Sequence, residues 1–350
     1  MNTICLDSII FGLQRNGGIS NYWARLLDSF SAAPDPVWRT EMPRKIRFQH
    51  FRPHWQLGAS HSETLPSGLS RYLSCALAPT DAVMHTSYYR LPSKRVKGYV
   101  VTAYDFMYER YRSGPPLWVH RLQKLRSLER ADVVSCISTF TRDEVIDIHP
   151  GIDASKLKVV PLGVDSQAFY PDPRESDSEL DRTVLFIGLR GGYKRFELAV
   201  AAIESIADLK LGIVGPPLDA AEVRGLSINL PGRWQHFGAV APGRLRELYS
   251  SAFALIFPSD CEGFGLPVLE AMACHCPVVA SCRGSLPEVG GDAARFAAQQ
   301  RAEDYAAALL DLNSSSVRAK AIAAGTVQVA AFTWQRTIQS TREIYSALLD

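Results

Sequence analysis

Short apolar runs recur along the chain, with helical patterns between them. The runs lie at 2–10, 81–85, 99–103 and 131–137 in the first half, and at 184–187, 210–215 and 254–257 in the second. Such runs are typical of strands buried in a parallel sheet. Between strands, apolar residues at helical spacing (Tyr22, Leu26, Leu27 and Phe30) predict crossover helices. The pattern favours an α/β fold.

The length of the chain and one polar segment predict two domains. A chain of 350 residues is long enough for two cores. Residues 170–182 are polar and contain prolines, as an inter-domain linker does. Residues 303–350 are helical, with a last helix around 334–349.

The composition is that of a soluble globular protein, with 47% hydrophobic and 21% charged residues. Residues 1–6 lack the basic segment and long apolar run of a signal peptide, and no window reaches the length of a membrane span. We therefore expect a cytoplasmic protein. The chain has seven cysteines, an odd number, and we expect their thiols to be reduced. One cluster lacks the spacing of a zinc knuckle, so buried small residues are favoured there over a zinc site. The cluster consists of Cys261, Cys274, His275, Cys276 and Cys282.

The positive charge lies in the first half of the chain. Residues 1–150 carry 19 Lys and Arg against 13 Asp and Glu, whereas the whole chain has a net charge of +2. Two basic segments contain aromatics, 38–55 and 117–130, and such mixtures bind anionic lipids. The alternatives are a solvated loop for the first segment and an ordinary amphipathic surface helix for the second, with Trp118, Leu122 and Leu125 at helical intervals. The ordinary helix is favoured there. Nucleic acid is not an expected partner, because no recognition motif accompanies this modest charge.

The stretch 254–279 combines a strand, a glycine loop and a helix start. Gly263 and Gly265 bracket Phe264 and let the backbone approach a ligand closely. Pro267 suits the first helical position, and a helix N-terminus favours an anion.

Two carboxylates frame this helix start. Glu262 lies in the loop, and Glu270 lies one turn into the helix. They could hold the hydroxyls of a ligand that also carries phosphate, as a sugar nucleotide does. The alternative is that Glu262 ends a strand and Glu270 only complements the helix dipole.

Three other loops carry candidate residues. Gly17 and Gly18 precede a helix and form a second candidate phosphate loop. Arg190 and Lys194 follow the strand 184–187 and could neutralise a diphosphate. Asp105 follows the strand 99–103, at the end of a parallel strand where ligands bind.

The string EGFGLPVLE, followed by EAM and PVV, resembles the glutamate-x7-glutamate signature of the family 4 retaining glycosyltransferases. VVPLGVD, GLRGGYKRF, QHFGAV and RGSLPEVGGDAARF also resemble family segments, in order. The resemblance implies the GT-B fold, in which two Rossmann-like domains face each other across a cleft. Residues 1–168 would form the acceptor-binding domain and 169–330 the nucleotide-sugar domain. Residues 331–350 would form a helix that crosses back to the first domain.

The resemblance also implies roles for the candidate residues. A hexose-type sugar would move from a nucleotide-diphosphate sugar with retention of configuration, without a metal or a cofactor. The implied catalytic residues are Glu262 beside the sugar, Arg190 and Lys194 on the phosphates, and Asp105. The implied donor-binding residues are Glu270 on the ribose, Gly17 and Gly18 facing the diphosphate, and the backbone of Phe264, Gly265 and Leu266.

The sequence departs from the family at two positions. Tyr104 stands where many members have histidine, so it is only a candidate replacement. His275 stands where the family usually has glycine, and histidine tolerates a left-handed backbone at some cost.

The resemblance implies a saccharide or lipid-linked saccharide acceptor. We expect a role in assembly of bacterial O-antigen, lipopolysaccharide or exopolysaccharide, with peripheral contact to the anionic inner face of the membrane. One alternative is a nucleotide-sugar epimerase or hydrolase of the same fold, which needs no acceptor. Another is a non-catalytic nucleotide-binding protein.

Overall fold

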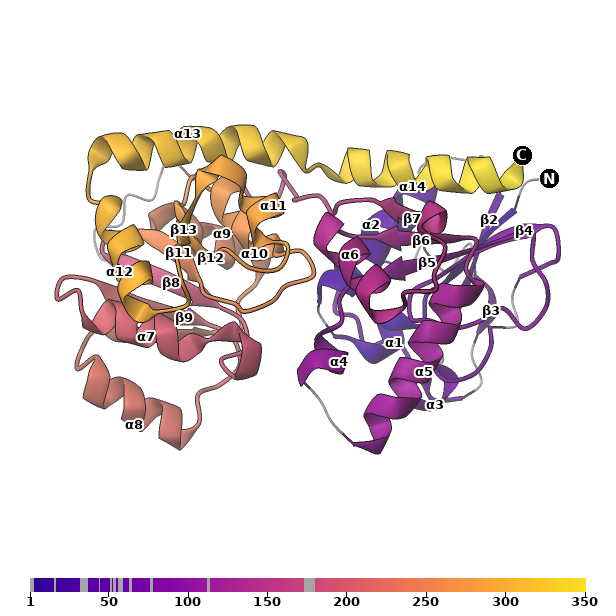
Figure 1. The fold of residues 1–350 in the computed structure, drawn as a ribbon, viewed down its shortest axis with the longest axis horizontal. Coiled ribbons are helices and arrows are strands. Elements are labelled where there is room, and N and C mark those ends of the chain that lie inside the picture. Colours follow the sequence, from indigo (N-terminus) through magenta and orange to yellow (C-terminus); the bar gives the residue numbers. More distant parts are fainter. Residues whose placement is uncertain are drawn as a thin grey trace. The chain divides into compact units, whose positions relative to one another are not determined.

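The computed structural model describes residues 3–15, 17–31, 37–43, 45–50, 52, 55, 59–62, 65–75, 78–111, 114–172 and 180–350. The chain divides into two compact units, shown in Figure 1. Unit 1 comprises Met1–Leu162 and Trp334–Asp350, and unit 2 comprises Gly163–Thr333. The boundaries expected from the sequence fall nearby, after residues 168 and 330. Most of the proposed linker, 173–179, lies outside the described residues.

Unit 1 is built on a seven-stranded sheet with the order β3-β2-β1-β4-β5-β6-β7. All its strand pairs are parallel. β1, β4 and β5 are buried along their whole length, which explains why they read as continuous apolar runs. The strands are β1 Thr3–Asp7, β2 Val37–Met42, β3 Ala59–Ser62, β4 Ala82–Thr86, β5 Gly98–Ala103, β6 Val133–Cys136 and β7 Leu157–Val159.

The helices of unit 1 include the last helix of the chain. They are α1 Ile10–Leu13, α2 Gly18–Ser31, α3 Ser67–Ser70, α4 Met107–Tyr111, α5 Pro115–Arg130, α6 Thr139–Ile148 and α14 Trp334–Leu349. α14 packs against α2, β4 and β5. Its Tyr345 hydroxyl lies 2.5 Å from His85 Nδ1, and His85 Nε2 lies 2.7 Å from Thr102 Oγ1. Burial lowers the pKa of His85 to about 3, so the imidazole is neutral at this junction.

Unit 2 has a six-stranded parallel sheet with the order β10-β9-β8-β11-β12-β13. The chain order reverses between β8 and β11, so the loops after these two strands are neighbours at the carboxyl edge of the sheet. The Asp260 N–H donates to the Tyr193 carbonyl across this point, at 2.7 Å. The strands are β8 Thr183–Ile187, β9 Lys210–Val214, β10 Trp234–Gly238, β11 Ala254–Phe257, β12 Val278–Ser281 and β13 Ala294–Ala297.

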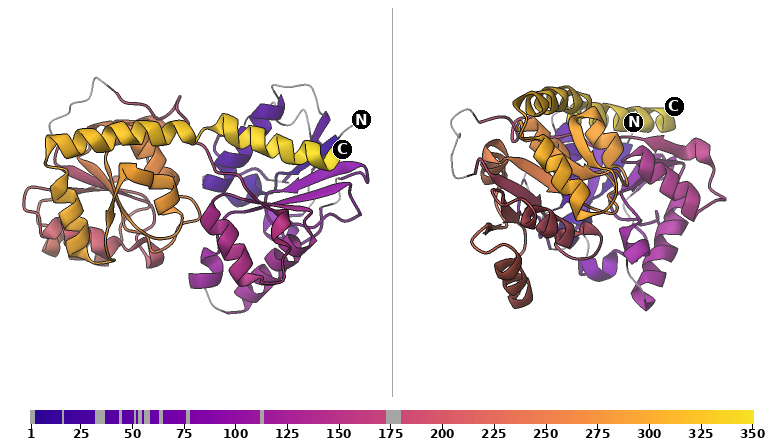
Figure 2. Two further views of the ribbon diagram at one scale, coloured as in Figure 1. Left: turned by 45° about the horizontal axis from the view of Figure 1, so that its top comes forward. Right: turned by 60° about the vertical axis from the view of Figure 1, so that its left-hand side comes forward.

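Helices complete the second unit. They are α7 Phe196–Glu204, α8 Ala220–Asn229, α9 Pro242–Ser251, α10 Leu266–Ala273, α11 Leu286–Gly290, α12 Ala302–Asp311 and α13 Ser315–Ala331. α13, orange to yellow in Figure 2, packs along α10. The predicted α/β fold with two Rossmann-like domains is thus confirmed within each unit.

The cysteines are mostly core residues. Cys282 is exposed and the other six are buried. Within the described ranges, no three His, Cys, Asp or Glu side chains are grouped so that they could hold a metal ion. Within the same ranges, every helix falls short of the length and hydropathy needed to cross a bilayer.

α10 ends in a left-handed residue, His275, with φ 58°. The N–H groups of His275 and Cys276 donate to the carbonyls of Met272 (3.1 Å) and Ala271 (2.9 Å). This is the Schellman arrangement, in which glycine is the usual residue. The structure therefore shows why the family prefers glycine here.

Replacing His275 with glycine should stabilise the protein by up to about 1 kcal/mol, because glycine adopts this backbone without strain. His275→Ala is the matched control, since it also loses the 3.4 Å contact between His275 Nε2 and Thr326 Oγ1 but keeps a Cβ. Urea unfolding of the three proteins measures the difference. A glycine variant no more stable than the alanine variant would show that the backbone stores no strain here.

Candidate functional site

The amino end of α10 forms the centre of the candidate site in unit 2. Gly265, the residue before the helix, has φ +98°, and a Cβ there would lie 2.7 Å from Leu286 Cδ2. The position therefore needs glycine. Pro267 lies in the first turn, where a missing N–H costs nothing. In the first turn Pro267 has no N–H, and the Val268 N–H donates to the Gly265 carbonyl at 3.0 Å. The aligned peptide dipoles of α10 still give this end a partial positive charge.

Glu262 and Lys194 meet beside this helix end, although 68 positions separate them in the sequence. Lys194 Nζ lies 2.6 Å from Glu262 Oε1, and the two side chains are 12% and 13% exposed. Lys194 ends the short turn Gly192–Lys194 that follows β8, and Glu262 lies in the loop that follows β11. The reversal of strand order between β8 and β11 therefore brings them together.

The backbone of Glu262 is held from the loop after β12. Its carbonyl accepts from the Ser285 N–H at 3.2 Å and from Ser285 Oγ at 2.9 Å. Gly284 packs so closely that a Cβ would lie 2.8 Å from the Glu262 nitrogen. The carboxylate is thus carried on a fixed loop, which favours a defined contact with a ligand.

Glu270 lies one turn into α10 and is partly buried. The Tyr249 hydroxyl donates to Glu270 Oε2 at 3.4 Å. Burial raises the pKa of Glu270 to about 7. The carboxylate therefore changes its charge near neutral pH in the absence of a ligand.

The raised pKa of Glu270 predicts pH-dependent nucleotide binding. A carboxylate that accepts ribose hydroxyls must be ionised, so affinity should rise about tenfold from pH 6 to pH 8. The same carboxyl group should make the free protein less stable as pH rises from 4.5 to about 7, because the native state keeps a proton that the unfolded chain has lost. Calorimetric titration with a nucleotide sugar, which has no phosphate ionising in this range, measures the first effect.

Glu270→Gln is the control for both parts, and it should flatten the two pH dependences. If wild type and Glu270→Gln show the same pH profile of binding, Glu270 does not contact the ligand.

Arg190 is held by the loop that follows β9. Its guanidinium donates to both carboxylate oxygens of Glu222, at 2.7 and 3.0 Å, and to the carbonyls of Pro216 and Pro217, each at 2.8 Å. Its side chain is 7% exposed. His236 Nε2 contacts the same loop at the carbonyls of Gly215 (3.2 Å) and Pro216 (3.1 Å). To reach a phosphate, Arg190 would have to exchange these bonds.

Glu222 is the residue that sequence reasoning missed at this loop. It is the third residue of α8 and forms a capping box with Asp219. The spacing Asp219-x-x-Glu222 marks a helix start in the sequence, but it does not show that Arg190 lies opposite.

The remaining candidates belong to unit 1. Gly18 is exposed and begins α2, and the Gly17 carbonyl accepts from Ser20 Oγ and the Asn21 N–H, each at 3.0 Å. The adjoining Asn16 lies outside the described residues. Both glycines are thus part of the start of α2.

Asp105 and Tyr104 are adjacent in the sequence but differ in burial and in hydrogen-bond partners. Asp105 Oδ1 accepts from the Met107 N–H at 3.1 Å, and its carboxylate is partly exposed. Tyr104 is buried, and its hydroxyl accepts from Trp23 Nε1 at 2.7 Å. The Tyr104 hydroxyl is therefore used within the core, which disfavours it as a replacement for a ligand-binding histidine.

Comparisons with known proteins match both halves of the chain. The family model "Glycosyltransferase Family 4" matches residues 17–168, and the model "Glycosyl transferases group 1" matches residues 172–326. The O-antigen chain mannosyltransferase B of Escherichia coli is 29% identical over 243 residues, which is 63% of this chain and 62% of that protein. The alpha-maltose-1-phosphate synthase of Mycolicibacterium smegmatis is 30% identical over 257 residues, 65% of each. The matches thus span less than two thirds of these relatives.

Solved structures resemble the whole chain. Sucrose-phosphate synthase from Thermosynechococcus elongatus matches with a TM-score of 0.76 and 21% identity, over 99% of both chains. Anabaena HepE, in complex with UDP and glucose, matches with a TM-score of 0.74 and 16% identity, over 99% of this chain and 100% of that one. At these identities the likeness shows the fold.

Proposed function

This chain belongs to glycosyltransferase family 4 and has the GT-B fold, and from this we propose that it transfers a hexose-type sugar from a nucleotide-diphosphate sugar with retention of configuration. The observation that carries the proposal is the Lys194–Glu262 pair, 2.6 Å apart at the positive end of α10. A cation and a helix end suit a departing diphosphate, and a carboxylate suits the positive charge that develops on the sugar.

Each group of the site has one task in the proposed reaction. The bond from the anomeric carbon to the diphosphate breaks, and the acceptor oxygen bonds to that carbon on the same face. The acceptor proton passes to the departing diphosphate. Lys194 and the N–H groups of α10 stabilise the diphosphate, so we propose that the reaction needs no metal and no cofactor. Glu262 stabilises the sugar ring, and Glu270 accepts the ribose hydroxyls.

The proposed acceptor is a saccharide or a lipid-linked saccharide. Similarity to an O-antigen chain mannosyltransferase supports assembly of bacterial O-antigen, lipopolysaccharide or exopolysaccharide. The structure of HepE with UDP-glucose supports a nucleotide sugar as the donor. We propose that the protein acts in the cytoplasm, in peripheral contact with the inner face of the membrane.

Nucleotide release from a donor panel tests the proposal. The panel is UDP-glucose, UDP-galactose, UDP-N-acetylglucosamine, GDP-mannose, dTDP-rhamnose and ADP-glucose, each with and without mono- and disaccharide acceptors. We expect one donor to release its nucleotide only with an acceptor, and NMR of the product to show the donor's anomeric configuration.

The alternatives give different results in the same assay. A hydrolase releases nucleotide equally without an acceptor, and an epimerase converts the donor sugar without releasing nucleotide. A binding protein retains the nucleotide and turns nothing over. An inverted anomeric configuration in the product would contradict the proposed stereochemistry.

A further inference from the structure

α5 presents three large apolar side chains to solvent, those of Trp118, Val119 and Leu122. The spacing of Trp118, Leu122 and Leu125 fits an ordinary amphipathic helix that buries these residues. In the structure Trp118 is 72% exposed and Leu122 is 50% exposed. Among the described side chains of the helix, the buried ones are instead His120, Lys124, Ser127 and Leu128. The expected burial of Trp118 and Leu122 is therefore wrong, whereas Leu125 is half-buried and Leu128 is buried.

A buried ionic cluster fixes this orientation. Lys124 Nζ donates to the Asp105 carbonyl and lies 3.2 Å from Glu109 Oε2. It also lies 3.7 Å from the centre of the Phe106 ring. His120 Nδ1 lies 3.3 Å from the other Glu109 oxygen. Turning α5 to bury Trp118 would expose this cluster and break its bonds, so the apolar face stays outside.

The exposed face continues onto the segment that contains α3. Leu69, Tyr72 and Leu73 are 61%, 39% and 50% exposed. The Gln123 amide donates to the Arg71 carbonyl and joins this segment to α5. We call the combined surface the α3–α5 face; it consists of Leu69, Tyr72, Leu73, Trp118, Val119 and Leu122.

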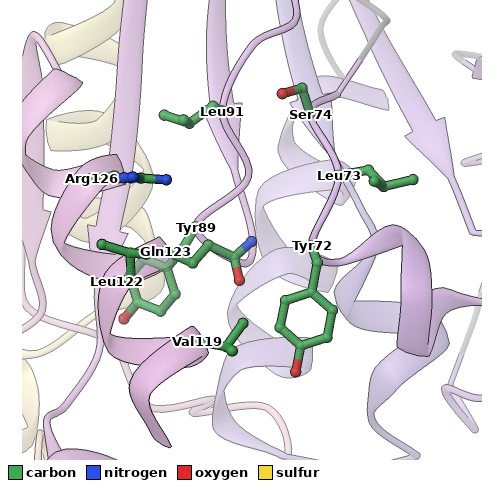
Figure 3. A pocket seen from close by; sticks show the side chains of 9 residues that line it. All are labelled: Tyr72, Leu73, Ser74, Tyr89, Leu91, Val119, Leu122, Gln123 and Arg126. Carbon is green, nitrogen blue, oxygen red and sulfur yellow. The ribbon is translucent and has the colours of Figure 1, made fainter. Parts of the chain in front are cut away.

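A pocket opens between the two parts of this face, and Figure 3 shows its lining side chains. Its volume is about 190 Å³. Tyr72 and Leu73 lie on one side, and Val119 and Leu122 lie on the other. Tyr89, which also lines the pocket, has φ 49°, a strained conformation for a bulky residue. The pocket gives an apolar group a place to enter below the surface.

The charges around the α3–α5 face are positive. Arg71 lies beside Tyr72, with its guanidinium 4.6 Å from the ring centre. Arg121 and Arg126 are exposed on α5, and Arg126 also lines the pocket. The sequence has no Asp or Glu in 65–75 or in 118–128. An occupant of this face should therefore combine apolar groups with negative charge.

The other basic segment, 38–55, gives less support for a membrane-binding surface. Phe48 and Trp55 are buried and stack on Phe11, with ring centres 5.2 and 5.4 Å apart. Arg44 and Phe51 of that segment lie outside the described residues. Of the described aromatics in the two basic segments, Trp118 of α5 is thus the one that is exposed beside arginines.

We propose that the α3–α5 face docks on a bilayer rich in anionic lipids. Its aromatic and aliphatic side chains enter the interface, and Arg71, Arg121 and Arg126 contact lipid phosphates. The pocket between Tyr72 and Leu122 takes an apolar segment of a lipid. This inference rests on the peripheral membrane contact of the proposed function and adds the surface that makes the contact and the class of lipid that it binds.

Vesicle co-sedimentation of the full chain tests the docking surface. Vesicles of pure phosphatidylcholine are compared with vesicles that contain 40% phosphatidylglycerol, at low and at high salt. We expect at least tenfold stronger binding to the anionic vesicles, weakened by salt. Trp118→Ser/Leu122→Ser and Arg121→Glu/Arg126→Glu should each lower this binding at least tenfold.

Two matched controls come from α8 of unit 2, where Ile228 is 77% exposed and Arg224 is exposed. Ile228→Ser and Arg224→Glu should leave vesicle binding unchanged. Quenching of tryptophan fluorescence by brominated lipids gives a second readout, which Trp118→Phe should largely remove. Circular dichroism and nucleotide binding show whether each variant folds.

Three results would overturn the proposal. The first is that wild-type protein does not bind anionic vesicles. The second is that a folded α5 double variant binds them as strongly as wild type. The third is a concentration-dependent dimer that Trp118→Ser/Leu122→Ser abolishes, since a second copy would then cover this face. Failure of nucleotide binding would overturn the proposed reaction and leave the vesicle result standing.

Discussion

Replacing Glu262 with glutamine is expected to lower kcat about 10²- to 10³-fold. Glutamine keeps the shape of the side chain and an oxygen that accepts from Lys194 Nζ, now 2.6 Å from the carboxylate. It removes the negative charge that the proposal places beside the sugar as positive charge develops on the ring. Because this charge acts mainly in the transition state, kcat should fall while nucleotide affinity changes little. Steady-state kinetics and calorimetric titration measure the two quantities.

Glu197→Gln is the matched control for this variant. Glu197 also pairs with a cation in unit 2, Arg195 at 3.3 Å, but at a surface position where the pair contributes little. The control should keep wild-type kcat. If the Glu262→Gln enzyme kept more than a third of wild-type activity, Glu262 would have no catalytic role.

Replacing Lys194 with methionine is expected to lower kcat/KM about 10²- to 10³-fold. Methionine keeps most of the apolar stem and removes the cation, whose Nζ lies 4.7 Å from the centre of the Phe257 ring. Charge on the departing diphosphate then loses its side-chain partner. Affinity for a nucleoside diphosphate should fall more than affinity for the matching monophosphate. Kinetics and titrations with both nucleotides check this.

Lys210→Met serves as its control, because Lys210 is exposed at the amino end of β9, away from the carboxyl edge of the sheet. Lys194→Met also leaves Glu262 without its cation. The double variant Lys194→Met/Glu262→Gln separates these effects, since contacting residues show non-additive losses. Equal losses of monophosphate and diphosphate affinity would mean that Lys194 does not contact the phosphates.

The sequence predicted the parts of the fold that depend on local pattern. β1, β4 and β5 read as apolar because both of their faces are buried. The turn at Gly265 and Pro267 predicted the start of α10 from backbone chemistry alone. The contact between Lys194 and Glu262 also follows from topology, because in a doubly wound sheet the loops after strands at the reversal point are neighbours.

Other features depend on tertiary contacts that no local pattern contains. The resemblance places Arg190 on the phosphates, and its bonds to Glu222 depend on where α8 lies against the loop after β9. The orientation of α5 depends on Lys124 finding Glu109 on α4, an interaction that outweighs the apolar spacing of the helix. The placement of the Tyr104 hydroxyl in the core depends likewise on its hydrogen bond from Trp23 of α2. For α5 and Tyr104 the polar partner is buried, and for Arg190 it is the partly exposed Glu222. Sequence spacing alone contains no signal of these contacts.

Nucleotide binding to the α10 site tests the central claim most directly. The measurement is calorimetric titration of UDP, GDP, dTDP, ADP and CMP into wild type, Lys194→Met, Glu270→Ala and the Lys210→Met control. We expect one nucleotide to bind wild type and the control alike, and Lys194→Met and Glu270→Ala each to weaken its binding at least tenfold. Well-folded wild type that binds none of the five, or a nucleotide bound equally by all four proteins, would show that the α10 site does not bind the donor.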